Sequence, residues 1–127
     1  MGRPPAKGLT ERELEVMHVF WSRGEATAAE ARDRLESAGL DRTYTTIANL
    51  VRGLHGKGFL EQVNAERPFV YRPARTFEDV SGRLLGDLVS RVFRGSRAQL
   101  LRRLVDDRKL TAEERAVLEK VLEEDGR

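Results

Sequence analysis

The side chains best suited to contact another molecule lie in one stretch, between Arg42 and Gly58, that contains no acidic residue. At the spacing of an α-helix, Thr45, Asn49 and Arg52 fall on one side of this stretch. Their hydroxyl, amide and guanidinium groups can hydrogen-bond base edges or phosphates in the major groove of duplex DNA. Asparagine can pair with adenine, arginine can pair with guanine, and a threonine methyl can contact thymine. The predicted base-facing residues are therefore Thr45, Thr46, Asn49 and Arg52.

Further donors flank this predicted helix and suit the phosphate backbone. Arginine and lysine contacts of this kind hold a protein on the duplex without reading its sequence. The amino-terminal end of a helix also carries free amides and a positive partial charge, which favour a nearby phosphate. The predicted phosphate contacts are Arg42, Thr43, Tyr44, Lys57 and Arg67.

The other side of the stretch is apolar, which is typical of a helix packed on a core. Ile47, Leu50, Val51 and Leu54 follow the i, i+3, i+4, i+7 pattern. Thr43 is placed to cap the first turn, because its hydroxyl can accept a hydrogen bond from a free amide. The sequence therefore predicts a half-buried helix whose polar side faces outward.

Two further helices must precede this one to position it. Thr10 with Glu13 and Thr27 with Glu30 have the spacing of capping boxes, and each pair is followed by apolar residues at helical intervals. The first helix should end at residues 22–24 and the second at about Ser37. Two helices joined by a short turn, the later one with a polar outer side, form a helix-turn-helix.

A change of period after Gly58 predicts a β-hairpin. Residues 59–63 and 69–73 read as short strands, and Arg67 lies near the turn between them. Such a hairpin is ordinary structure in itself. Directly after a recognition helix, however, it matches the wing of a winged-helix domain.

The remaining chain predicts three amphipathic helices, over about 77–94, 97–107 and 112–124. Thr76 with Asp79 marks the first start, and Ser96–Gln99 and Thr111–Glu114 have the spacing of full capping boxes. A unit of roughly 50 residues cannot bury this much leucine and valine alone. We expect a second copy to cover them, the alternative being a monomer whose helices fold back on the winged helix. The predicted dimer contacts are Val80, Leu84, Leu88, Val92, Leu100, Leu104, Val117 and Val121.

Composition limits the remaining possibilities. The 127-residue chain carries a net charge of +2 and no cysteine, and residues 42–75 hold six basic but only two acidic side chains. No apolar run is long enough to span a membrane, and no signal peptide is recognisable, so we expect a cytoplasmic protein. The sequence indicates no metal site, no cofactor and no enzymatic activity: the two histidines lie far apart, and His18 reads as a helix residue at the edge of the core.

The predicted fold class is mainly α with a small β-hairpin. We expect residues 1–8 to form a mobile basic tail, residues 9–75 a winged helix-turn-helix domain, and residues 76–127 a helical dimerisation domain. The favoured function is sequence-specific DNA binding by a homodimer on a palindromic site. The alternative is a winged helix that binds another protein, although the outward side of residues 44–56 lacks the aromatic anchors typical of protein interfaces.

Several segments taken in order resemble the penicillinase-repressor (BlaI/MecI/CopY) family of winged-helix transcriptional regulators. The similarity covers roughly residues 9–123. It is carried by residues 13–17 with Trp21, by residues 44–47, by residues 57–60 and by the tail around residues 110–114.

The resemblance implies a homodimeric repressor that binds palindromic operators, often those of β-lactamase or penicillin-binding-protein genes. It also implies release by a sensor protease that triggers cleavage in the carboxy-terminal helices. The matching bond is Arg103–Leu104, where this chain departs from the Asn-Phe-like pair of cleaved relatives. The copper-responsive branch uses cysteine pairs that this chain lacks.

Overall fold

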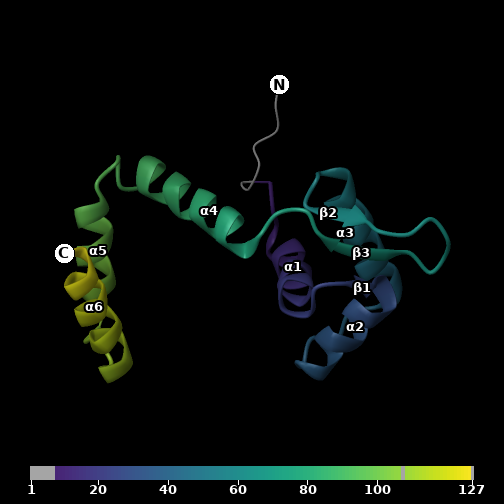
Figure 1. The fold of residues 1–127 in the computed structure, drawn as a ribbon, viewed down its shortest axis with the longest axis horizontal. Coiled ribbons are helices and arrows are strands. Elements are labelled where there is room, and N and C mark those ends of the chain that lie inside the picture. The colour runs from purple at the N-terminus through teal and green to yellow at the C-terminus, as the bar shows by residue number, and fades with distance from the viewer. Residues whose placement is uncertain (1–7, 107, 127) are drawn as a thin grey trace. The chain divides into compact units, whose positions relative to one another are not determined.

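The computed structural model describes residues 8–106 and 108–126 (Figure 1). Within them the chain forms six helices and one small antiparallel sheet, which confirms the predicted fold class. Residues 1–7 of the predicted basic tail lie outside the described residues. The chain divides into two compact units, the first ending at Leu85 and the second beginning at Gly86.

The first two helices begin where their capping residues predict. Helix α1 spans Glu11–Arg23 and helix α2 spans Ala28–Ser37. At α1 the Glu13 amide donates to the Thr10 hydroxyl over 3.1 Å, and the Thr10 amide donates to the Glu13 carboxylate over 2.8 Å. An equivalent reciprocal pair opens α2. Each capping box satisfies amides that have no partner within the helix.

Helix α3 spans Tyr44–Gly56, as the apolar period predicts. The hydroxyl of Thr43 accepts from the amide of Thr46, so the predicted cap is formed. At the other end Gly58 adopts a φ of +86°, a conformation that favours glycine, and the Phe59 amide donates to the Leu54 carbonyl. This turn directs the chain from α3 into the sheet.

The sheet contains the predicted hairpin and one strand that the sequence did not reveal. Strands β2 (Leu60–Gln62) and β3 (Val70–Pro73) pair antiparallel and are shorter than predicted. The additional strand β1, Ala26–Thr27, pairs with β3 and gives the order β1-β3-β2. It links the wing to the start of α2.

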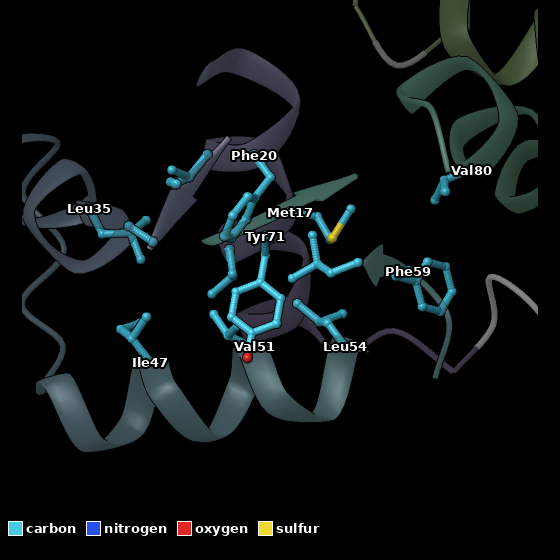
Figure 2. Packing of buried hydrophobic residues seen from close by; sticks show 14 residues of the cluster. Met17, Phe20, Leu35, Ile47, Val51, Leu54, Phe59, Tyr71 and Val80 are labelled. Carbon is cyan, nitrogen blue, oxygen red and sulfur yellow. The ribbon is translucent and has the colours of Figure 1, made fainter. Parts of the chain in front are cut away.

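The core lies between α1, α2, α3 and the sheet. Figure 2 shows Ile47, Val51 and Leu54 directed from α3 toward residues of α1 and toward Tyr71. Val80, which the sequence assigned to a dimer contact, is instead buried in this core at 1% exposure. The period of its helix identified an apolar side correctly but could not tell which surface that side covers. This assignment of Val80 is therefore corrected.

Three helices complete the chain: α4 (Phe77–Arg91), α5 (Arg97–Asp106) and α6 (Ala112–Asp125). The first part of α4 belongs to the first unit, so the division falls ten residues later than the sequence suggested. Helix α4 ends earlier than predicted because Arg94 and Gly95 adopt φ values of +52° and +87°. The Ser96 capping box is only half formed, since the Ser96 amide donates to the Phe93 carbonyl instead of to Gln99. The capping box of Thr111 and Glu114 is complete.

Candidate nucleic-acid interface

The outward face of α3 presents three of the four predicted base-facing residues. Thr45, Asn49 and Arg52 are exposed, while Ile47, Val51 and Leu54 on the other side are buried. The Arg52 guanidinium donates to the Asn49 side-chain oxygen over 3.2 Å, so the two groups lie side by side. Both side chains are exposed and carry groups of the kind that can hydrogen-bond base edges.

Thr46 lies differently. It is half-buried, and its hydroxyl accepts a hydrogen bond of 2.9 Å from the hydroxyl of Thr43. The pair belongs to the helix cap rather than to the exposed row. The helical period alone could not show this, because residues 45 and 46 are separated by only about 100° around the helix axis.

A groove of about 630 Å³ runs beside α3, within the first unit. It is lined by the start of α2, by α3, and by the wing. Tyr44, which is 54% exposed, lies on its edge. The lining also includes His55 and Gln62, which the sequence did not single out. His55 follows Arg52 by three residues on α3, and that spacing was the available signal. The lining residues are Thr27, Ala28, Ala29, Tyr44, Ala48, Val51, Arg52, His55, Gln62, Arg67, Pro68, Phe69 and Tyr71.

The wing loop is fixed by the side chain of Asn64. Its amide donates to the carbonyls of Glu66 and Pro68, and its oxygen accepts from the Val70 amide. On this loop Arg67 is exposed, with its guanidinium carbon 5.2 Å from the centre of the Phe69 ring. The guanidinium of Arg67 therefore lies beside the groove, and no ion pair within the described residues includes it.

Arg72, on the same hairpin, is neutralised by neighbours. It forms ion pairs with Glu61 and Glu25. The pKa of Arg72 lies above its ordinary value, chiefly because the Glu61 carboxylate accepts its hydrogen bond and, next, because of that carboxylate's charge. Arg67 and Arg72 thus differ in what they can offer an anion.

Two of the predicted phosphate contacts are also paired, and both pairs lead to α1. Arg42, just before α3, forms a two-pronged ion pair with Glu15 at 3.0–3.1 Å. Lys57, just after α3, contacts both oxygens of Glu13 at 2.9 and 3.1 Å and the carbonyl of Gly8 at 2.9 Å. These contacts hold both ends of α3 on α1.

Of the other predicted dimer contacts, Leu84 lies in the first unit and the rest lie in the second. Leu88, Val92, Leu104, Val117 and Val121 are exposed, while Leu84 and Leu100 are half-buried and Leu84 packs against the core of the first unit. Neither α5 nor α6 buries any residue. Arg103 and Leu104, which the family resemblance implies as a cleavage bond, lie exposed on α5.

Two absences hold for the described residues. Among residues 8–106 and 108–126, no helix combines the length and apolar character needed to cross a membrane. The same part of the chain contains no group of three or more His, Cys, Asp or Glu side chains that could hold a metal ion.

The chain is similar to known regulatory proteins over most of its length. A curated relative, the methicillin resistance regulatory protein MecI of Mammaliicoccus sciuri, is 23% identical over 116 residues, covering 90% of this chain and 92% of the relative. The MecI protein of Staphylococcus aureus strain N315 is also 23% identical over 114 residues, with the same coverage.

Two solved structures are similar to this chain. The DNA-binding domain of the repressor BlaI is 29% identical with a TM-score of 0.51, and the match covers 62% of this chain and 93% of that domain. RosR of H. salinarum, at 17% identity and a TM-score of 0.54, covers 95% of this chain and 96% of its own and shows a shared fold. The penicillinase repressor family matches residues 9–124, and the chain belongs to this family of DNA-binding transcriptional repressors.

Proposed function

We propose that the protein represses transcription as a homodimer, with α3 of each copy in the major groove of a palindromic operator. The observation that carries the proposal is the exposed, acid-free face of α3, on which Thr45, Asn49 and Arg52 lie in one row. A twofold dimer places two such helices about one turn of DNA apart, which matches a palindrome.

The residues divide into three roles in this proposal. Thr45 and Asn49 contact bases, Arg52 contacts guanine or a phosphate, and Thr46 supports the cap of α3. Thr43, Tyr44 and Arg67 contact phosphates. Arg42 and Lys57 position α3 on α1, since their charges are matched by Glu15 and Glu13. We reassign these two from phosphate contacts for that reason.

The second copy covers the apolar side chains of the second unit. Leu101, Leu104, Val117 and Leu122 are each more than half exposed, and such surface is costly to leave in water. A further copy of the same chain presents the same side chains, so both copies bury apolar area together.

For the genes under control, the proposal is supported by the names of the relatives. The MecI proteins are described as methicillin resistance regulators. We extend that role to this chain as control of β-lactam-response genes. Release by a sensor protease would act on α5, where Arg103–Leu104 is exposed.

The proposal is tested by selecting bound duplexes from a random DNA library and measuring how affinity changes with salt. We expect enrichment of a palindrome, two protein chains per site, and affinity that falls steeply as salt rises, because phosphate contacts release counterions. A protein-interaction module predicts no enriched sequence and no salt-dependent binding to any duplex.

A further inference from the structure

The groove beside α3 contains no acidic side chain, although the protein has 21 of them. Its charged or chargeable lining residues are Arg52 and His55 on α3 and Arg67 on the wing, joined by the phenols of Tyr44 and Tyr71. The start of α2 contributes Thr27, Ala28 and Ala29, which carry no charge. A concave surface with this lining favours an anion.

The cations of the groove are not used by the protein itself. Arg52 contacts a neutral amide oxygen and Arg67 an aromatic ring. None of the ion pairs within the described residues includes either arginine. By contrast, Arg42, Lys57 and Arg72 in the same unit all pair with carboxylates. The two arginines beside the groove are therefore available to an external anion.

A histidine, His55, stands beside the two arginines in the lining of the groove. It is exposed, lines the groove, and places its ring edge-on to Tyr71 at 5.6 Å between centroids. Imidazole changes charge near neutral pH, and its charged form donates from both nitrogens. An anion seated between the two arginines would favour the charged form.

We propose that this groove seats one phosphate of the DNA backbone, held by Arg52, His55 and Arg67, so that DNA binding is accompanied by protonation of His55. The inference rests on the proposed function. It adds a residue, His55, to the DNA-contacting set and a dependence of operator binding on pH. Because the bound form carries one more proton, affinity rises as the pH falls.

The pH dependence has a matched control, since the chain has two histidines. DNA affinity is measured by fluorescence anisotropy between pH 5.5 and 8 for the wild type, His55→Gln and His18→Gln. His18 lies against Trp21 and Phe77, away from the residues that line the groove. We expect the wild type and His18→Gln to bind roughly threefold to tenfold more tightly at the lower pH, and His55→Gln to lose this gain.

A second test places an acid in the groove without disturbing the fold. Ala29 is exposed in the first turn of α2, where glutamate is favourable for the helix. We expect Ala29→Glu to bind DNA about tenfold or more weakly than the isosteric Ala29→Gln, with thermal stability equal or higher.

The outcomes distinguish failure of the phosphate site from failure of the proposed function. If Ala29→Glu binds as tightly as Ala29→Gln, or if His55→Gln keeps the full pH dependence, the groove does not seat the phosphate. If the wild type binds no duplex at any pH, the proposed function itself fails.

Discussion

The two units of this chain differ in how far they bury their apolar side chains. All fourteen buried hydrophobic residues within the described chain lie at or before Val80, whereas α5 and α6 bury none. The helices of the second unit are well formed and amphipathic, and α6 has a complete capping box. Capping residues and apolar periods thus specify helices in both units, but only the first unit encloses a core within the single chain.

This difference in burial indicates which contacts stabilise each unit. In the first unit α3 is held by a core on one side and by ion pairs to α1 at both ends. Its outer face carries exposed polar side chains that are not part of the core. In the second unit the apolar side chains are exposed in the single chain, and the proposed dimer would supply their packing. The first unit thus exposes the polar face of α3, and the second exposes apolar side chains.

The largest effect is expected from Phe20→Ala, which empties the centre of the first core. Phe20 is wholly buried, and removal of such a side chain costs about 3–5 kcal/mol of unfolding free energy. Denaturant unfolding followed by circular dichroism measures it, with Gln99→Ala on the exposed surface of α5 as the control in the other unit. Equal losses in the two variants would contradict the proposed contrast between the units.

Next in size is Leu104→Asp on α5, where the side chain is 61% exposed in the single chain. A charge at the centre of an apolar interface should raise the dimer dissociation constant about thirtyfold or more, equivalent to roughly 2 kcal/mol. Sedimentation measures the dimer fraction. Gln99→Asp, on the same helix, should leave it unchanged; unaltered dimerisation by Leu104→Asp would remove α5 from the interface.

A smaller effect is expected from Lys57→Met. Its partner Glu13 is 9% exposed on the side chain, whereas Lys57 is 35% exposed, so solvent weakens the pair and the loss is about 1 kcal/mol. Because Lys57 positions α3, the salt dependence of DNA binding should keep its slope. A slope reduced by about one unit would show instead that Lys57 contacts phosphate.

The smallest change in stability, near zero, is expected from two variants of the wing. Arg67→Ala should weaken binding to all duplexes alike and flatten the plot of log affinity against log salt by about one unit. Arg72→Gln should leave that slope nearly unchanged, because Glu61 and Glu25 already occupy its guanidinium. Equal slopes for both variants would exclude Arg67 as a phosphate contact.

Local features of the fold could be predicted from sequence because their causes are local. A capping hydroxyl and its target amide lie three residues apart, so Thr10, Thr27 and Thr43 mark helix starts correctly. Strand β1 was missed because a two-residue strand has no period, and its pairing with β3 joins segments more than forty residues apart.

The candidate site could be predicted in outline for the same reason. The exposed row on α3 follows from the helical period. The ion pairs of Arg42 and Lys57 with α1 span 27 and 44 residues of sequence, so no motif announced them. Likewise, α4 showed its apolar side in the sequence, but only the folded chain shows that Val80 belongs to the first core.

The central claim is that the outward face of α3 reads DNA sequence, and Asn49→Ala tests it most directly. Affinities for the selected operator and for random duplex DNA are measured at one salt concentration, with Glu36→Ala as a control on the exposed surface of α2. The difference in binding free energy between operator and random DNA should shrink by about 1–3 kcal/mol in Asn49→Ala and stay constant in the control. An unchanged ratio, or equal loss on both DNAs, would contradict the assignment of α3 as the reading helix.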